Sequence, residues 1–412
     1  MRFPLARVQF VPCDPETRET RQTGLCVVTV ERIVQSTASV EMRVSRRFLS
    51  SFPALVTRGP AGQVGVERLT EADLPRECLY KQTRGSCDLL VRVEFSTLNY
   101  KDALVVSGRY PGLRTPMVAG CDIAGRVVED RSGRLREGEG VVSNGWGVGT
   151  DHYGGFAGLA SLRSCWALQL PGGMTSKQAA TIGTAGYTAM LCIQAMEDIG
   201  LRPGRGPVMV TGATGGVGSV AVLLLAQLGY SVTAVSGKAE TEAAYLTALG
   251  ASEVLDRRQL EGEPRPLGRE TYSGCVDSCG GRVLAGLLPL IQYGGVVSAC
   301  GLASGLALTS TVAPFILRGV TLAGVESALL PLERRRQVYT RFGPLLTEDK
   351  LALLSGQFSS GSDRRQESDG WCCRRGQNCR SLLPPSAGGQ NAGGEDHGQI
   401  CGGFKSGVID NQ

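Results

Sequence analysis

The strongest constraint on the fold is a glycine-rich turn that lies between two apolar segments. Residues 208–211 (VMVT) have the composition of a buried strand, and the turn GATGGVG at 212–218 leads into the apolar helical sequence SVAVLLLAQL. Gly212, Gly215 and Gly218 are three residues apart, and without a Cβ they let the backbone turn tightly and approach a phosphate. The N–H groups at the start of a helix attract an anion. This strand–turn–helix order predicts a dinucleotide-binding turn, rather than glycines that serve close packing alone.

The residues after the next predicted strand indicate which dinucleotide binds. The segment SVTAV at 231–235 is followed by Ser236, Gly237 and Lys238. An NAD site usually has an acidic residue at this strand end to bind the ribose hydroxyls, whereas a hydroxyl and a cation suit a 2′-phosphate. Arg257, after the following predicted strand, can supply a second cation. We therefore expect NADPH as the cofactor. The alternative for Lys238 taken alone is a solvated surface lysine.

Two regions of different periodicity make up the central part of the chain. Residues 52–174 contain FPALV, DLLVRVEF and AGRVVE, which have strand composition and are separated by glycine, proline and charged turns. Residues 175–325 alternate short apolar strands with helical segments, which is typical of a parallel sheet covered on both faces. The prediction is an α/β protein in which a doubly wound parallel sheet adjoins a β-rich domain.

The two ends differ from this pattern. Residues 1–51 contain eight arginines, no lysine and five acidic residues, and the run MRVSRRFLSSF from Met42 has three arginines and three serines but no acid. We interpret residues 1–51 as an extension: a transit peptide for organellar import of an otherwise cytoplasmic protein, a disordered segment, or an upstream addition. Residues 355–412 contain 12 glycines and four cysteines without apolar periodicity, so we expect a disordered or aberrant tail.

The composition of the chain and its few candidate metal ligands exclude several kinds of function. The 43 basic and 38 acidic residues give a net charge of +5, which is too small and too dispersed for nucleic-acid binding. The longest apolar stretch, at 217–228, is shorter than the roughly 20 residues of a membrane span. Most of the 14 cysteines stand singly in apolar segments, as reduced buried thiols do. The two histidines are His152 and His397, and no zinc pattern matches the possible cluster of Cys372, Cys373, Cys379 and His397.

Nine segments in order carry a specific resemblance to a known family. They are STLNYKDALVVSG, VAGCDIAGRVV, GWGVGTDHYGGFAGLA, TIGTAGYTAMLC, VTGATGGVGSVAV, AVSGK, YGGVVSACGLA, TVAPFILRGVTLAGVES and PLERRRQVY. From about Phe52 to Leu354 the chain resembles the acrylyl-CoA reductase family, the quinone-oxidoreductase-like, zinc-independent members of the medium-chain dehydrogenase/reductase superfamily. The resemblance implies a GroES-like domain packed on a Rossmann domain, with the active site between them. Residues 326–354 would return to the GroES-like domain, and Cys121-Asp122 lies where zinc-dependent relatives gather ligands but has no partners.

The resemblance also assigns roles to individual residues. The pyrophosphate would be bound by Gly215, Gly216, Val217, Gly218, Ser219 and Val220. The 2′-phosphate end would be held by Ser236, Gly237, Lys238 and Arg257, although the family often has arginine where Lys238 stands. The nicotinamide would be bordered by Tyr100, Ala103, Leu302, Ile316 and Ser327; core packing is the alternative for Ala103, Leu302 and Ile316. The candidate catalytic residues are Tyr100, as a proton donor, an orienting hydroxyl or only a stacking ring, and Asn99, as a hydrogen-bond donor.

The function that the resemblance implies is hydride transfer from NADPH to an electron-poor C=C bond, most directly that of acrylyl-CoA, which gives propanoyl-CoA. Lys101, Arg109 and Arg114 are candidate cations for CoA, although each equally suits a solvated surface. The alternatives are a quinone reductase and, from another class, a non-catalytic NADPH-binding protein. We expect a homodimer that acts on a small molecule and needs neither nucleic acid nor membrane.

The family pattern stops near Leu354. Family members continue with a helix and a final G-x-x-x-G-R strand, whereas SGQFSSGSDRRQ begins a different sequence here. We therefore expect the closing strand of the GroES-like domain to be missing.

Overall fold

The computed structural model describes residues 51–59, 63–78, 85–263 and 265–355, together with the backbone of 356–359, 372–373 and 407–410. The chain divides into two compact units, Met1–Phe48 and Leu49–Gln412, and every described residue belongs to the second. The interpretation of residues 1–51 as a transit peptide or extension therefore lies outside the described residues. The finer division at 174, 325 and 354 stays a prediction.

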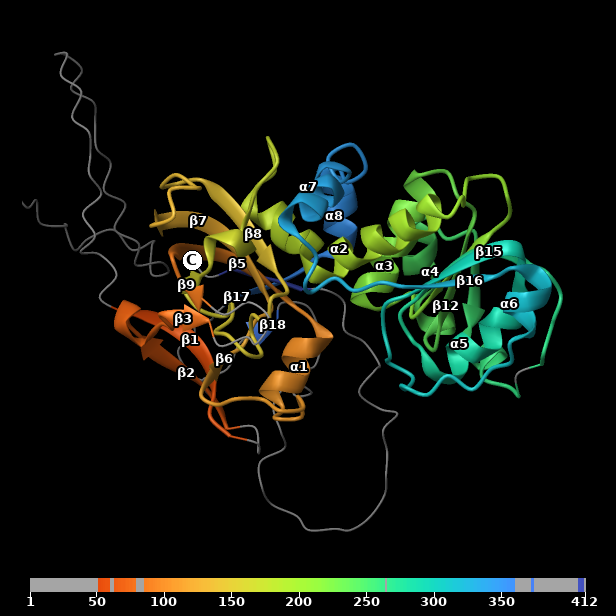
Figure 1. The fold of residues 1–412 in the computed structure, drawn as a ribbon, viewed down its shortest axis with the longest axis horizontal. Helices are drawn as coiled ribbons and strands as arrows, with labels where there is room; N and C mark the ends of the chain where they lie inside the picture. The colour runs from red at the N-terminus through yellow and green to blue at the C-terminus, as the bar shows by residue number, and fades with distance from the viewer. Residues whose placement is uncertain are drawn as a thin grey trace, which may run out of the picture. The chain divides into compact units, whose positions relative to one another are not determined.

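The glycine turn follows a strand of a six-stranded parallel sheet (Figure 1). Its strands, in spatial order, are β13 (Glu253–Asp256), β12 (Val232–Ser236), β11 (Val208–Thr211), β14 (Tyr272–Asp277), β15 (Ile291–Ala299) and β16 (Thr321–Gly324). The order 3-2-1-4-5-6 is that of a doubly wound dinucleotide-binding sheet, in which ligands bind at the carboxyl ends of the strands near the central switch point. This confirms the predicted α/β fold.

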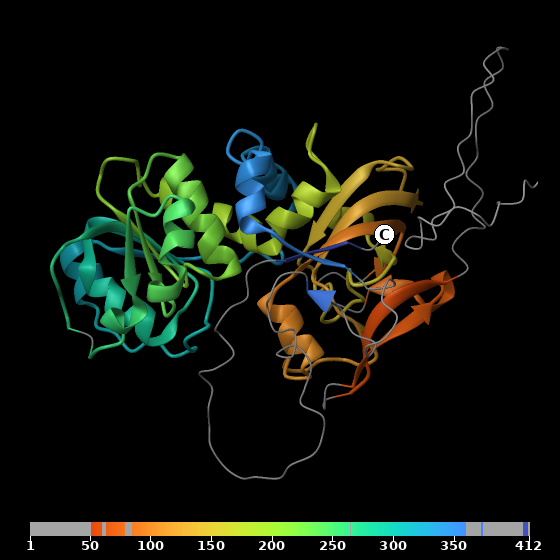
Figure 2. The same cartoon turned by 180° about the vertical axis from the view of Figure 1, so that it is seen from behind.

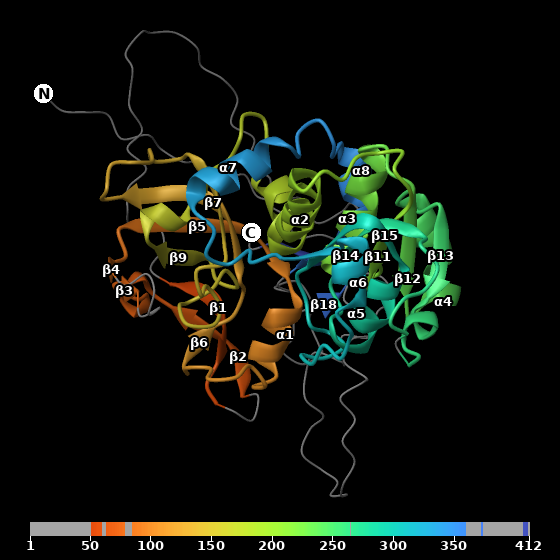
Figure 3. The same ribbon diagram turned by 45° about the vertical axis from the view of Figure 1, so that its right-hand side comes forward.

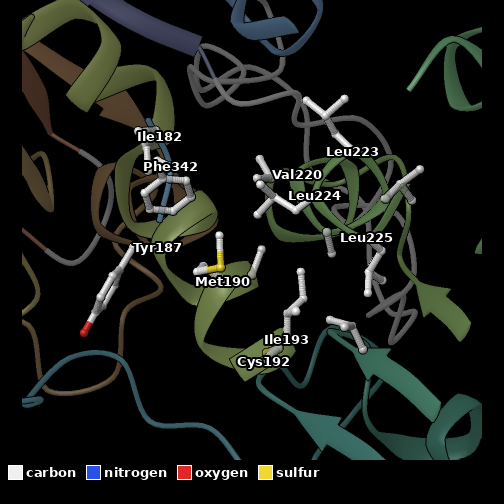
Figure 4. Close-up of a cluster of buried hydrophobic side chains, with 14 of the residues drawn as sticks. Ile182, Tyr187, Met190, Cys192, Ile193, Val220, Leu223, Leu224, Leu225 and Phe342 are labelled. Carbon is white, nitrogen blue, oxygen red and sulfur yellow. The ribbon is translucent and has the colours of Figure 1, made fainter. Parts of the chain in front are cut away.

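Alternate side chains of the central strands enter two separate apolar cores. Val208 and Val210 of β11 belong to one core, whereas Met209 between them belongs to the other. The first core also contains residues of α2 (Ser176–Asp198), α3 (Gly216–Gln227) and α4 (Ala239–Ala248), part of which Figure 4 shows. The second contains residues of α5 (Gly281–Leu287), and Phe315 of α6 (Ala313–Arg318) packs against it. Strands buried on both faces explain the continuous apolar runs in the sequence.

The β-rich part contains a large mixed sheet, a small sheet and a hairpin. In spatial order the large sheet comprises β10 (Leu168–Gln169), β8 (Gly140–Asn144), β7 (Asp122–Asp130), β5 (Leu89–Leu98), β19 (Gly407–Asp410), β17 (Gly356–Ser359) and β18 (Cys372–Cys373), and β9 (Leu159–Leu162) pairs with β5. The small sheet comprises β2 (Val64–Leu69), β1 (Phe52–Thr57) and β6 (Met117–Val118), and the hairpin β3 (Glu77–Cys78) and β4 (Gly85–Ser86). Helix α1 (Tyr100–Val106) directly follows β5.

Helix α2 connects the two parts. It contacts β5, β7 and β8 of the mixed sheet and β14 and β15 of the parallel sheet. Its helical path is interrupted at Gly183, where φ is 51°. Helices α7 (Leu332–Thr340) and α8 (Glu348–Leu354) pack against α2, as the blue segment in Figures 2 and 3 shows. None of the described helices has the length and apolar character that crossing a bilayer requires.

We expected the closing strand of the GroES-like domain to be missing, but one short segment, β19, forms a strand in the mixed sheet. The backbone of β19 pairs antiparallel with β5, from Gly407 opposite Leu98 to Asp410 opposite Phe95, and β17 pairs with β19. The sequence GVID has strand composition, and pairing with β5 satisfies backbone groups that a sheet edge would leave open. Strand β18 adds two residues beside β17. The expected disorder of the remaining tail concerns residues outside the described ranges.

Candidate active site

The glycine turn has the geometry that a phosphate site needs. Gly212 has φ of 60°, a left-handed conformation that glycine adopts without strain. A Cβ on Gly218 would lie 2.2 Å from the carbonyl oxygen of Gly212, so no other residue fits without moving the backbone. Gly215 caps α3, and its carbonyl accepts the first helical hydrogen bond, from the Ser219 N–H at 2.9 Å. The N–H groups of residues 216–218 therefore have no partner within the helix and face outward at its start, where an anion binds.

The end of β12 gathers a hydroxyl and two cations. The Ser236 hydroxyl is hydrogen-bonded to that of Thr214 at 3.0 Å and accepts the backbone N–H of Lys238 at 3.0 Å. A Cβ on Gly237 would lie 2.9 Å from Arg257 Nε, so the arginine side chain packs directly against this glycine. Arg257 forms a partly exposed ion pair with Glu261 at 3.3 Å, whereas Lys238 has no ion pair with another described residue. This donor set fits a 2′-phosphate, and no acid caps the strand end.

A buried carboxylate joins the carboxyl ends of β11 and β14. Asp277 accepts hydrogen bonds from Thr211 Oγ1 at 2.6 Å and from the Gly280 N–H at 2.8 Å, and burial raises its pKa. Farther along this edge, a Cβ on Gly301 would lie 2.2 Å from the Ser278 carbonyl oxygen. This close approach fixes the backbone just before Leu302 beside β14.

Two residues expected beside the nicotinamide are apolar and exposed. Leu302 is 57% exposed and Ile316 is 72% exposed, so neither is the buried core residue that the alternative interpretation required. Ala103 is half-buried on α1. Exposed aliphatic side chains such as these are available to a ligand or to another chain.

On the GroES-like side, Asn99 and Tyr100 begin helix α1 and differ in availability. The Asn99 amide donates to Asp122 Oδ2 at 2.8 Å and to the Thr97 carbonyl at 3.2 Å, so both of its N–H groups are used inside the protein. The expected donation from Asn99 to a substrate therefore has no free hydrogen in this structure. Tyr100 is 42% exposed, and its hydroxyl has no hydrogen-bond partner among the described residues. Tyr100 is thus the available hydroxyl, and Asn99 holds the turn that presents it.

A second buried carboxyl group lies in the first turn of α1. Asp102 Oδ2 accepts the Asn99 N–H at 2.8 Å, and Oδ1 accepts the Cys121 N–H at 2.8 Å. Burial raises the pKa of Asp102 to about 7, and the negative charge of Asp122 acts in the same direction. This group titrates close to neutral pH two residues from Tyr100.

Sequence reasoning missed the polar residues that surround this turn. Asp122, in the apolar segment VAGCDIAG, accepts hydrogen bonds from Asn99, Asn144 and Thr184. A charge inside an apolar strand was the available sign of a buried network, but its partners lie 22–62 residues away along the chain. Gly183 is required beside it, because a Cβ there would lie 2.8 Å from Asp122 Oδ2.

Ser327 is held from two directions. Its hydroxyl is hydrogen-bonded to that of Thr188 on α2 at 2.9 Å, and its carbonyl accepts from Arg335 Nη2 at 3.0 Å. Arg335 belongs to the run RRR, which resembles a solvated surface in the sequence, yet it is buried. The sequence contains no sign that separates this arginine from its two neighbours.

Within the described ranges, no three His, Cys, Asp or Glu side chains form a group that could hold a metal ion. His152 is buried, with Nε2 2.6 Å from the Ser161 carbonyl oxygen and its ring edge-on to Trp166. Burial raises the pKa of the Cys121 thiol well above its usual range. The possible cluster at Cys372, Cys373, Cys379 and His397 lies outside the side chains that the structure describes.

Two family models match consecutive parts of the chain. The alcohol dehydrogenase GroES-like domain matches residues 85–187, and the zinc-binding dehydrogenase model matches residues 216–338. Among curated proteins, the probable acrylyl-CoA reductase AcuI of Escherichia coli is 49% identical over 62% of this chain and 78% of its own. The acrylyl-CoA reductase AcuI of Ruegeria pomeroyi is 46% identical over 71% of this chain and 86% of its own.

The chain belongs to the acrylyl-CoA reductase family. It is an oxidoreductase of the quinone-oxidoreductase-like medium-chain type, as the sequence motifs predicted. The putative quinone oxidoreductase YhfP of Bacillus subtilis is 40% identical over 71% of this chain and 86% of its own.

Solved structures of family members share the fold. The yhdH oxidoreductase of Salmonella enterica in complex with NADP has a TM-score of 0.70 at 44% identity, covering 74% of this chain and 92% of the other. The yhfP protein of Bacillus subtilis with NAD bound has a TM-score of 0.70 at 38% identity, covering 75% and 92%. The family thus includes members seen with either dinucleotide.

Proposed function

We propose that the protein is an NADPH-dependent reductase that converts acrylyl-CoA to propanoyl-CoA. The observation that carries this proposal is the grouping of Ser236, Lys238 and Arg257 at the end of β12, where an NAD enzyme has an acid. The relatives named acrylyl-CoA reductase and the NADP complex of a relative support it.

The residues present fit the dinucleotide along its length. The N–H groups at the start of α3, formed by Gly215, Gly216, Val217, Gly218, Ser219 and Val220, would hold the pyrophosphate. Lys238 and Arg257 would hold the 2′-phosphate. Tyr100, Leu302 and Ile316, with Ala103 and Ser327, would border the nicotinamide. When bound, NADPH supplies the hydride that reduces the β-carbon of the alkene.

The chain's own residues position the alkene and supply the proton. Tyr100, the exposed hydroxyl at the start of α1, donates a hydrogen bond to the thioester oxygen or a proton to the α-carbon. Asn99 keeps the turn in place and does not donate to the substrate. Arg109 and Arg114 are exposed in the segment after α1, and with the half-buried Lys101 they attract the phosphates of CoA.

One assay separates this function from its alternatives. Purified protein is given NADPH with acrylyl-CoA, with a benzoquinone, or with no acceptor. We expect oxidation of NADPH with acrylyl-CoA that exceeds the rate with quinone, the acceptor that the name of the Bacillus subtilis relative suggests. Faster turnover of quinone would replace the substrate assignment, and binding of NADPH without turnover of either would indicate a non-catalytic protein.

We infer that two copies of this chain form a dimer through the parallel sheet. Strand β16 is an edge of the sheet among the described strands, with backbone groups open to another strand. Beside it, the segment 306–317 exposes four large apolar side chains that the proposed nicotinamide site does not use: Leu306, Leu308, Val312 and Leu317. A patch of this kind marks an interaction surface.

Sedimentation of the unmodified protein should give twice the mass of one chain. The double variant Leu306→Glu, Val312→Glu should give the mass of one chain. A monomeric unmodified protein would contradict the inference.

A reducing cytoplasmic compartment suits the protein. The eight cysteines whose side chains the structure describes form no disulfide, and seven of them are buried or half-buried. The relatives reported above are bacterial. No comparison supports organellar import, and a fluorescent fusion of the full chain that gathers in an organelle would contradict this localisation.

A further inference from the structure

Two buried charges near the proposed active site have no counter-ion in contact. Asp122 is 1% exposed and Arg335 is 2% exposed, and neither forms an ion pair within the described part of the chain. A buried charge is costly unless hydrogen bonds satisfy it. Asp122 accepts from Asn99, Asn144 and both donors of Thr184 at 2.5–3.0 Å. Neutral groups therefore stabilise the carboxylate on every side.

Arg335 is satisfied in the same way. Its guanidinium donates to the backbone carbonyls of Asn144 at 2.7 Å, Ser327 at 3.0 Å, Ala328 at 2.8 Å and Leu330 at 2.8 Å. Its planar group lies 4.9 Å from the ring centre of Trp146 and 5.0 Å from that of Tyr187. Figure 4 shows the Tyr187 hydroxyl turned away from the apolar cluster. Two aromatic faces and four carbonyls leave the guanidinium one orientation.

Asn144 connects the two charges. Its side-chain N–H donates to Asp122 Oδ1 at 2.7 Å, and its backbone carbonyl accepts from Arg335 at 2.7 Å. Its side-chain oxygen accepts the Tyr339 hydroxyl at 2.6 Å. The side chain must donate on one side and accept on the other, which an amide does and a carboxylate does not.

Each end of this connection holds a residue of the proposed site. Asp122 fixes Asn99, the cap directly before Tyr100, and Arg335 fixes the carbonyl of Ser327. We propose that the Asp122–Asn144–Arg335 bridge is a positioning device that sets the turn carrying Tyr100 and the loop carrying Ser327 relative to each other. This inference rests on the proposed function, which places both residues at the nicotinamide. Among the described residues no hydrogen bond or ion pair joins the glycine turn or Lys238 to the bridge, so it acts on the reacting end and leaves dinucleotide affinity largely unchanged.

The first test compares two arginines on the same part of the chain. Arg335→Lys keeps the charge but loses the planar group that reaches four carbonyls. The matched control is Arg341→Lys, because Arg341 pairs with Glu197 on α2 at 2.8 and 3.2 Å and does not touch the Ser327 loop. With acrylyl-CoA, Arg335→Lys should lower kcat by about tenfold or more and change the Kd of NADPH by less than about threefold. Equal kcat values for the two variants would overturn the bridge.

A second readout needs no turnover. The emission of bound NADPH reports the surroundings of the nicotinamide, and it should differ from that of the unmodified protein in Arg335→Lys but not in Arg341→Lys. If the unmodified protein fails to reduce acrylyl-CoA, the proposed function is wrong, and this comparison still decides the bridge. Unchanged emission in both variants would overturn it.

A third variant tests the role of the Asn144 amide through the pH dependence of kcat. Asn144→Asp places two carboxyl groups about 2.7 Å apart, and such a pair shares a proton whose pKa is raised. At pH 6 the shared proton restores the donor; as pH rises it is lost and the two charges repel. The kcat of the variant relative to the unmodified protein should therefore fall between about pH 6 and 9. Parallel profiles would contradict the bridge. The charged and titratable groups facing this pair are Arg335, Tyr339, Asp102 and Cys121, and Tyr187 and Glu326 lie beside Arg335.

Discussion

The nucleotide end of the site depends on cations rather than on an acid. Lys238 has no ion pair among the described residues, whereas Arg257 is partly neutralised by Glu261. An unpaired cation beside a bound phosphate contributes more than one that already has a partner, because only the paired one must give up an existing interaction. Lys238 should therefore be the stronger determinant of NADPH preference.

Lys238→Asp should weaken NADPH binding more than tenfold, about 1.4 kcal/mol or more, and change NADH binding far less. Lys238 is the cap residue of α4, where aspartate is favourable, so the variant should not lose thermal stability. Titration of both cofactors checks this, with Lys177→Asp, an exposed lysine in the first turn of α2, as the control. Equal affinity of the unmodified protein for NADPH and NADH would contradict the account.

Asp102 should make stability depend on pH. Its pKa is about 7 in the folded protein against an ordinary value of 3.8, so the folded state holds a proton that the unfolded state releases. The resulting stabilisation is complete below pH 4 and is lost as pH rises to about 7. In urea unfolding, the stability of the unmodified protein relative to Asp102→Asn should fall from pH 5 to pH 8. A constant difference would show that Asp102 is ionised throughout.

Single residues were predictable where a local pattern determines them. The glycine spacing and the missing acid after β12 depend on neighbours in sequence, and the structure brings these residues to one sheet edge. Arg335 and Asn144 are 191 residues apart, and the tertiary fold brings them within hydrogen-bond distance of each other. A run of three arginines is typical of a solvated face, so no local property distinguishes the buried one.

At the level of elements, strand β19 belongs to the mixed sheet because it pairs with β5. The strands of the parallel sheet were predictable because burial on both faces leaves short apolar runs between glycines and prolines. Strand β19 was not, because its four residues follow a long segment without periodicity and gain their order from the partner strand. Local composition could not reveal that partner.

Removing residues 405–412 should therefore destabilise the protein. The deletion takes away β19 and leaves an open edge along β5. Thermal unfolding should shift down by several degrees, roughly what a loss of 1–2 kcal/mol produces in a domain of this size. Removal of residues 1–48, which lie outside the unit that contains β5 and β19, serves as the control and should leave the midpoint unchanged. An unchanged midpoint after the C-terminal deletion would contradict the pairing of β19.

At the scale of the whole molecule, the proposed reaction needs a bound dinucleotide and residues of two parts, one built on the parallel sheet and one on the mixed sheet. In the proposed function the residues that follow the parallel strands contact the phosphates, and the turn after β5 supplies the exposed hydroxyl of Tyr100. The zinc-independent assignment remains a prediction from the few histidines. Elemental analysis should find far less than one zinc per chain, and activity should survive a chelator; stoichiometric zinc lost together with activity would contradict it.

The central claim is hydride transfer to the β-carbon of an acyl-CoA alkene. NADPH carrying deuterium on the transferred position of C4 is incubated with the protein and acrylyl-CoA, and the product is analysed by mass spectrometry and NMR. The account predicts propanoyl-CoA with one deuterium, located at the β-carbon, and a solvent-derived proton at the α-carbon. Unlabelled product, label at the α-carbon, or no propanoyl-CoA would contradict it.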